Sequence, residues 1–233
     1  MAQPLDLPSL YTLMTLRESG DAFAHAQSLA ARDGAGLLVW AGRHDVAEFA
    51  VVLEPEEPLA AARLAFYACM NALADALAVH APPEKPLAFA WPGEVRLNQG
   101  LLGGGQLAWP EEDEGERPDW LVFGAMVRVS APMDREPGEW TRGATLEEEG
   151  FAGVGAADII ESFSRHLMTA MNNWIELGPR SEVERWLERF PERRRAVIGP
   201  GGELIRPGEP PRDFAEALRA PGWLNADRGE PWL

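Results

Sequence analysis

The amino-acid sequence predicts an α+β fold, and two observations support this prediction. An amphipathic helix, two apolar strands and a long apolar helix come first along the chain, and closely spaced strand candidates follow them. Hydrophobic residues make up 46% and charged residues 25% of the chain, which is the balance of an ordinary folded domain. With 233 residues, the chain is long enough to bury one sizeable core.

The first predicted element is a helix at residues 19–32. Ser19 can act as its N-cap, since a hydroxyl oxygen accepts a hydrogen bond from the free backbone N–H groups of the first turn. Asp33 and Gly34 end the helix, because glycine tolerates the left-handed conformation that often follows a helix. The apolar face consists of residues at helical spacing, which are Ala22, Phe23, Ala26, Leu29 and Ala30.

Two apolar strands follow at residues 37–41 and 49–53, and the short polar turn of residues 42–45 joins them. An alanine-rich helix is then predicted at residues 58–80, where a pair of prolines soon stops it. This helix is apolar on nearly every side, so we expect it to lie buried against a sheet.

Strand candidates occupy residues 87–91, 95–97, 101–109 and 120–129. The acidic run at residues 111–116 lies between the last two of them. We expect it to be a solvated hairpin loop rather than a metal site, because consecutive carboxylates on a loop usually face water. The middle of the chain is therefore predicted to supply most of the sheet.

A proline- and glycine-rich stretch at residues 131–143 separates this part from a helical region. One helix is predicted at residues 156–177. Ser181 and Glu184 have the spacing of a capping box that opens a further helix. A short strand candidate at residues 196–198 comes after it.

We expect residues 1–190 to form the main domain and residues 191–233 to form a short C-terminal extension. The extension is too short and too rich in proline and glycine to fold by itself. Its Trp223, Trp232 and Leu233 are expected to pack back onto the main domain.

The chain is acidic, with 37 acidic and 21 basic residues and a formal net charge of −16. Nucleic acids and anionic membranes both select basic surfaces, so neither is expected as a partner. Cys69 is the only cysteine, which excludes an intrachain disulfide, and its apolar helical surroundings indicate a buried core residue. The N-terminus lacks signal-peptide features and no long apolar stretch indicates a membrane span, so a cytoplasmic location is expected.

A series of motifs lies between residues 88 and 130. It contains, in chain order, Trp91-Pro92, Glu94, Gly103-Gly104 and Phe123-Gly124. In this order and spacing the series resembles the biotin/lipoate A/B protein ligase family, whose biotin protein ligases carry K-W-P-N-D, K-x-x-G and V-x-G-x-G-x-N. Upstream, residues 19–22 resemble the S-T-N-x-A helix start of that family, and residues 38–43 resemble the strand before its nucleotide loop. A weaker match extends over residues 156–188.

The resemblance implies a mixed, mainly antiparallel sheet flanked by helices, related to the class II aminoacyl-tRNA synthetases. Family members activate biotin or lipoate with ATP and pass the acyl group to a lysine of a carrier domain. A small acid such as biotin or lipoate and a carrier protein are thus the implied partners, with ATP and magnesium as cofactors only if the chain is active. The candidate ligand-binding residues are Ser19, Trp40, Arg43, Trp91, Glu94, Gly103, Gly104 and Gly105.

The chain departs from the family where the charges of the reaction are held. The lysine that begins K-x-x-G is replaced by Gly100, and Lys85, the only lysine, lies between prolines in a predicted loop. Arg43 alone matches the arginine-rich phosphate loop. Each lost arginine–phosphate contact removes about 1.5–3 kcal/mol, which should cripple activation with ATP. Related octanoyl transferases use a cysteine with a lysine, and Cys69 is predicted to be core. The catalytic candidates are therefore Arg43 and Arg96, and enzymatic activity stays an open question.

The glycine run at residues 103–105 has two explanations, which are the close approach of a flat ligand, or a bulge or large neighbouring aromatic residue. The leading functional hypothesis is a divergent ligase-like domain that keeps a pocket for a biotin- or lipoyl-like acid without standard ATP-dependent ligation. One alternative is an active ligase or acyltransferase in which arginine replaces the family lysine. Another is a non-catalytic protein-interaction module with an acidic docking surface.

Overall fold

The computed structural model describes residues 5–111, 113–131 and 143–232. Its centre is a seven-stranded sheet with the order β1-β2-β3-β7-β6-β5-β4. β1 pairs with β2 in parallel, whereas all other neighbours in this sheet are antiparallel. The predicted fold class, a mixed and mainly antiparallel sheet flanked by helices, is confirmed. The strands are β1 (Thr12–Thr15), β2 (Leu37–Trp40), β3 (Val46–Leu53), β4 (Leu87–Ala90), β5 (Glu94–Leu97), β6 (Gly100–Ala108) and β7 (Leu121–Arg128).

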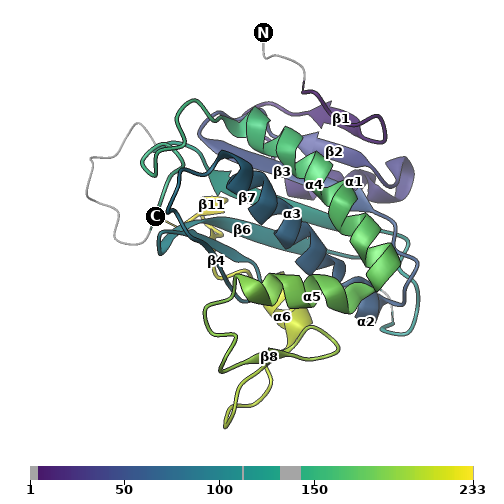
Figure 1. The fold of residues 1–233 in the computed structure, drawn as a ribbon. Helices are drawn as coiled ribbons and strands as arrows, with labels where there is room; N and C mark the ends of the chain where they lie inside the picture. The colour runs from purple at the N-terminus through teal and green to yellow at the C-terminus, as the bar shows by residue number, and fades with distance from the viewer. Residues whose placement is uncertain (1–4, 112, 132–142, 233) are drawn as a thin grey trace.

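Helices cover both faces of this sheet. α3 and α4 pack together on one face, in front of the strands in Figure 1, and bury the main hydrophobic core. α1 packs on the opposite face against β2, β3 and β7. On this face α1 does not cover β6, so other parts of the chain can pack there. The helices are α1 (Ala22–Asp33), α2 (Leu59–Ala62), α3 (Ala65–His80), α4 (Ala156–Leu177), α5 (Pro179–Glu188) and α6 (Phe214–Arg219).

Two predicted helix starts are wrong. The N-cap of α1 is Asp21 rather than Ser19, and its carboxylate accepts from the Ala24 backbone nitrogen at 2.8 Å. A carboxylate there also suits the positive end of the helix dipole. α5 starts directly after Gly178 with a proline at its first position, so the Ser181 hydroxyl lies inside the first turn and donates to the Gly178 oxygen.

The predicted helix at residues 58–80 is divided into α2 and α3. The chain turns at Arg63, whose guanidinium donates to Glu114 of the acidic loop at 2.7 Å. By length and composition the span Leu59–His80 would suffice to cross a bilayer, with a mean hydropathy of 1.3, but 83% of its most apolar window is buried inside the fold. This burial identifies it as a core helix packed against the sheet and α4.

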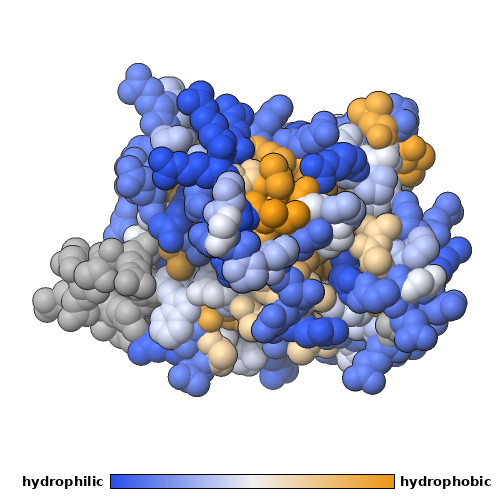
Figure 2. Space-filling model, turned by 90° about the horizontal axis from the view of Figure 1, so that it is seen from below, coloured by the Kyte–Doolittle hydropathy of each residue, from blue (hydrophilic) through white to orange (hydrophobic). Residues whose placement is uncertain are grey.

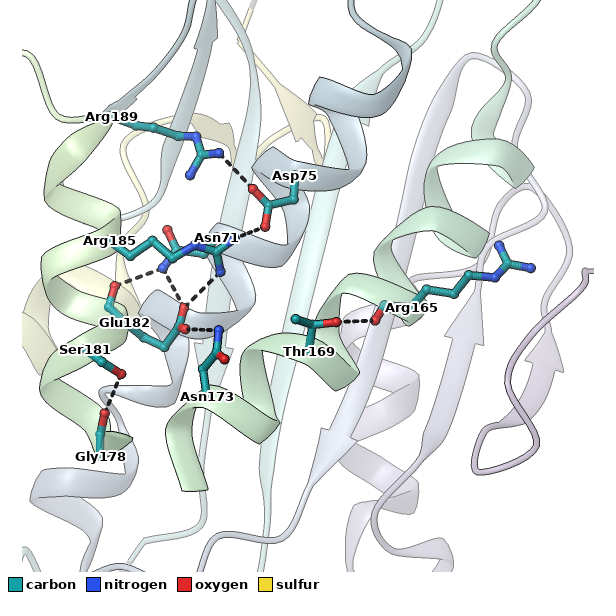
Figure 3. A network of polar contacts seen from close by, with 10 residues as sticks. All are labelled: Asn71, Asp75, Arg165, Thr169, Asn173, Gly178, Ser181, Glu182, Arg185 and Arg189. Atoms are coloured by element: carbon teal, nitrogen blue, oxygen red, sulfur yellow. Dashed lines mark hydrogen bonds and ion pairs between the residues drawn. The ribbon is translucent and has the colours of Figure 1, made fainter. Parts of the chain in front are cut away.

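A polar network joins α5 to α3 (Figure 3). The Asn71 amide nitrogen donates to both the backbone oxygen and the carboxylate of Glu182 at 2.8 Å. Asp75 accepts hydrogen bonds from Arg185 and Arg189. Glu182 is only 1% exposed, and Arg185 lies 3.4 Å from its carboxylate, so its charge is held by these neighbours rather than by water.

The C-terminal extension contains short elements, most of which the sequence analysis missed, as it also missed β1. Its elements are β8 (Val197–Ile198), which matches the predicted strand at residues 196–198, β9 (Leu204–Ile205), α6, β10 (Leu224–Asn225) and β11 (Glu230–Pro231). Trp223 is buried in the fold at 2% exposure, whereas Trp232 is 47% exposed and Leu233 lies outside the described residues. Seen from below, the molecule is mostly hydrophilic, and apolar residues reach the surface in small separate areas (Figure 2).

Candidate functional site

The glycine run of β6 is approached closely from both faces of the sheet. A Cβ on Gly105 would lie 2.5 Å from Met70 Sδ on the α3 face, and one on Gly104 would lie 2.5 Å from Trp223 Nε1 on the α1 face. Gly103 has a φ of +155°, and a Cβ there would lie 2.0 Å from a backbone oxygen of β7. Packing therefore disfavours a side chain at each of these positions, most strongly at Gly103 and Gly104, where a Cβ would meet backbone oxygens.

Trp223 of the C-terminal extension fills the α1 face at this point. Its Nε1 donates to the Gly105 oxygen at 3.0 Å. The indole packs with Val46, Leu101 and Met126 in a cluster separate from the main core. Of the two explanations left open for the glycine run, the structure contains the large neighbouring aromatic residue.

The hairpin of β10 and β11 continues over the same face and contacts β6 and β7. Arg128, which is 1% exposed, donates from Nη2 to the Pro231 oxygen at 2.8 Å. Glu230 Oε2 lies 3.7 Å from the same nitrogen and 3.6 Å from Arg43 Nη2. A carboxylate and a carbonyl of the chain itself thus engage the arginines on this face.

Arg43, the one match to the family's phosphate loop, lies among carboxylates. Its Nε and Nη2 donate to Asp45 at 3.0 and 2.7 Å, and these bonds lower the pKa of the Asp45 carboxyl. Glu48 Oε2 lies 3.7 Å from Arg43 Nη1, and its other oxygen accepts from the Ala22 backbone nitrogen at 3.0 Å. Burial nevertheless raises the pKa of Glu48. The positive charge of Arg43 is therefore balanced inside the protein.

The other predicted ligand-binding residues are spread over both faces. Trp40 and Trp91 belong to the main core on the α3 face, and Trp91 Nε1 donates to Tyr67 Oη at 3.0 Å. Ser19 is exposed in the turn before α1. Trp40 lies on β2 and Trp91 follows β4, on opposite sides of the sheet order, so the structure does not bring these two predicted ligand-binding residues together.

Glu94 and Arg96 form an ion pair with each other on β5. They alternate with Val95 and Leu97, which face the main core, so they lie on the face that carries Trp223. Arg96 Nη1 also donates to the Gln99 oxygen at 2.9 Å. The ligand-binding candidate Glu94 and the catalytic candidate Arg96 are thus engaged with groups of the protein itself.

No described residue supplies an ammonium group at the position of the family lysine. A Cβ on Gly100 would lie 2.8 Å from Ala144 Cβ, so even a small side chain would push this segment away. The Lys85 amine lies 2.6 Å from a Glu149 carboxylate oxygen. Cys69 is buried in α3, and its burial raises the pKa of the thiol. Within the described ranges, no group of three or more His, Cys, Asp or Glu residues could hold a metal ion.

A groove of about 880 Å³ stays open at the C-terminal end of β6, where residues of α1 and of α6 both line it. Gln106 and Ala108 line it as alternate residues of β6 beyond Gly104. The side chains around them come from α1, α6 and the segment after β6, and they include Phe23, Trp109, Leu218 and Arg219. Sequence reasoning missed this groove, because one wall is built by α6 of the C-terminal extension, far away along the chain.

The model of the biotin/lipoate A/B protein ligase family matches residues 7–188. The chain belongs to this family. No curated protein matches the chain. Among solved structures, a biotin protein ligase-like protein of unknown function from Silicibacter sp. TM1040 is 27% identical, with a TM-score of 0.82 over 92% of this chain and 99% of that one.

Two biotin protein ligases of solved structure are more distant. The enzyme from Aquifex aeolicus is 13% identical, with a TM-score of 0.65 over 84% of this chain and 91% of that one. The enzyme from Leishmania major, in complex with biotinyl-5-AMP, is 15% identical, with a TM-score of 0.54 over 88% and 98% of the two chains. At these identities the two ligases support the shared fold alone.

Proposed function

We propose that this family member binds a small molecule but does not catalyse ATP-dependent ligation of biotin or lipoate. The main supporting observation is the position of Trp223, whose indole packs closely against Gly104 where the family motif places a ligand-binding strand. A ligand at this strand would have to displace a buried tryptophan. Displacing such a side chain removes its hydrophobic stabilisation and its hydrogen bond to the Gly105 oxygen.

The charges beside Trp223 also oppose an acyl-adenylate. Stabilising its phosphate needs donors that are free to face the anion. Arg43 is paired with Asp45, Glu48 and Glu230, and the connection from β2 to β3 offers no further arginine. The residues present therefore do not fit ATP with its phosphates.

An active enzyme with arginine in place of lysine has less support. Arg96 is tied to Glu94 and to the Gln99 oxygen, while Arg43 is balanced by carboxylates. An arginine also differs from lysine in proton chemistry, since its guanidinium does not deprotonate in proteins. A biotin- or lipoyl-like acid would likewise compete with Glu230 for Arg43 and Arg128.

A protein-interaction module is the second candidate function. An apolar groove of about 660 Å³ runs beside α4, and Leu10, Met168 and Ile175 line it with exposed side chains. Glu54 and Glu56 stand at the same groove, and no lysine or arginine of the described part of the chain lines it. This combination suits a basic amphipathic helix as the partner.

A ligation assay tests the proposal directly. The protein is incubated with biotin, ATP, magnesium and a biotin carrier domain, beside an active biotin protein ligase as the positive control. We expect no biotin transfer to the carrier domain. Transfer above background that Arg43→Ala abolishes would refute the proposal.

Thermal-shift measurements with biotin, lipoate, octanoate, ATP and a non-hydrolysable biotinyl-adenylate analogue separate the candidates. Stabilisation by a free acid alone supports a binding protein. Stabilisation by the adenylate analogue contradicts the loss of ligation, and no stabilisation by any of these compounds favours the interaction module.

A further inference from the structure

The groove between α1 and α6 has a polar side chain, Gln106, at its floor. Gln106 is 8% exposed and pairs across the ladder with Gly124, and Phe23 covers Gly124 on the α1 face. Because directly opposed residues share a face, the Gln106 side chain lies on the α1 face too. No described residue hydrogen-bonds its amide, which has two donor hydrogens and an acceptor oxygen.

Apolar side chains flank this amide. Phe23 reaches over the sheet from α1, and Leu218 of α6, which is 2% exposed and part of the main core, borders the groove on the other side. Ala108 adds a small flat surface on the same face of β6. A flat ring can therefore lie between the two helices with one edge directed at Gln106.

The rim of the groove is acidic. Its carboxylates are Glu111, Asp113 and Glu114. Arg63 neutralises Glu114, so the other two carboxylates stand against Arg219, which stacks on the Trp109 ring at 5.0 Å. The described side chains of the rim thus leave an excess of negative charge, which repels phosphate groups.

We propose that this groove binds a flat, uncharged heterocycle that presents a hydrogen-bond donor and an acceptor side by side, and that it rejects phosphorylated forms of such a ring. A glutamine amide pairs with an edge of this kind through two hydrogen bonds, as it does with the adenine edge in nucleic acids. A nucleobase and a simple cyclic amide share this chemistry. The inference rests on the proposed function, because it names the class of small molecule that the chain would bind.

The binding test uses adenosine, cytidine and 2-pyridone as probes, and AMP as the phosphorylated counterpart of adenosine. Isothermal titration and ligand-observed NMR measure their binding to the full chain at one fixed ionic strength. We expect saturable binding of at least one uncharged probe, and AMP binding weaker than adenosine binding by roughly tenfold or more. If only a nucleoside binds, the ligand class is a nucleobase. If only 2-pyridone binds, the ligand class is a simple cyclic amide.

Two sets of variants test the assigned residues. Gln106→Leu keeps the size of the side chain and should weaken binding by roughly tenfold or more, because both ring hydrogen bonds are lost. Asn172→Leu, an exposed amide on α4, is the matched control and should bind as the unchanged chain does. The double variant Glu111→Gln with Asp113→Asn, both on an exposed loop, should strengthen AMP binding and leave adenosine binding unchanged.

The inference is overturned if no uncharged probe binds at millimolar concentration, if AMP binds as well as adenosine, or if Gln106→Leu binds the probes unchanged. If Gln106→Leu does not fold, the loop variant still decides, since unchanged AMP binding there would contradict the charge argument. No ligation assay enters this test. If the groove binds none of the probes, the proposed loss of ligase activity is unaffected. If the ligation assay is positive, the binding test of the groove can still be carried out.

Discussion

Replacing Trp223 with alanine is expected to lower the free energy of unfolding by about 4 kcal/mol. The indole is 2% exposed, and truncation of a buried large aromatic side chain costs about 3–5 kcal/mol through lost burial and the cavity left behind. The same change removes the donor that bonds the Gly105 oxygen at 3.0 Å, so that carbonyl loses this hydrogen bond. For a chain of this length, such a loss corresponds to a melting temperature lower by roughly 10 °C.

Urea denaturation followed by far-ultraviolet circular dichroism measures this effect without using tryptophan fluorescence. Trp223→Phe keeps a buried ring but loses the N–H donor, so we expect an intermediate loss of about 1–2 kcal/mol. Trp232→Ala is the matched control in the same extension. Trp232 is 47% exposed, and its replacement should change the free energy by less than about 1 kcal/mol.

The outcome decides whether the extension is part of the site. If Trp223→Ala costs less than about 1 kcal/mol, or no more than Trp232→Ala, the indole is not seated on β6 as described. The chain itself would then not occupy the glycine strand. A large loss for Trp223→Ala alone would support it.

Three further predictions concern the packing and charges around the site. Gly104→Ala should cost about 2 kcal/mol in a thermal unfolding assay, because its methyl group would lie 2.4 Å from a backbone oxygen, whereas Gly115→Ala has no atom within 4 Å and should be near neutral. Burial raises the pKa of Glu48, so the folded state binds more protons than the unfolded state. The unchanged chain should therefore lose stability relative to Glu48→Gln as the pH rises from about 4 to 7. A difference in stability that stays constant over this range would contradict the raised pKa. Glu182→Ala should lower the free energy of unfolding, measured in urea, by about 3 kcal/mol, because it breaks a buried network. The control Glu184→Ala, in an exposed ion pair, should lower it by less than about 0.5 kcal/mol. Equal losses for the two variants would refute the role of the network.

The sequence determined most of the secondary structure of the main domain. Periodicity placed the helix at residues 156–177 with the bounds of α4, and apolar runs placed β2, β6 and β7 to within a few residues. These signals are local, because a helix or strand must turn its own apolar side chains toward a core. The motif order around Trp91-Pro92 and the glycine run also indicated the family, which the match over residues 7–188 confirms.

Local signals failed where a short element depends on distant partners. β1 is four residues long and finds its backbone partners in β2, so its own sequence has little periodicity to detect. Caps were misjudged for a related reason, since Asp21 and Ser19 both suit an N-cap and only the geometry of the turn selects Asp21.

The sequence by itself determined the family, the fold class and the loss of the lysine at Gly100. Only the tertiary structure decided what meets the glycine run, because Trp223 lies far along the chain and nothing local to either segment specifies their contact. The same holds for the groove, where Gln106 and Arg219 converge through packing of α6 on β6. Contacts between distant segments depend on how all the apolar faces fit together at once, and a pattern read along one segment does not contain that information.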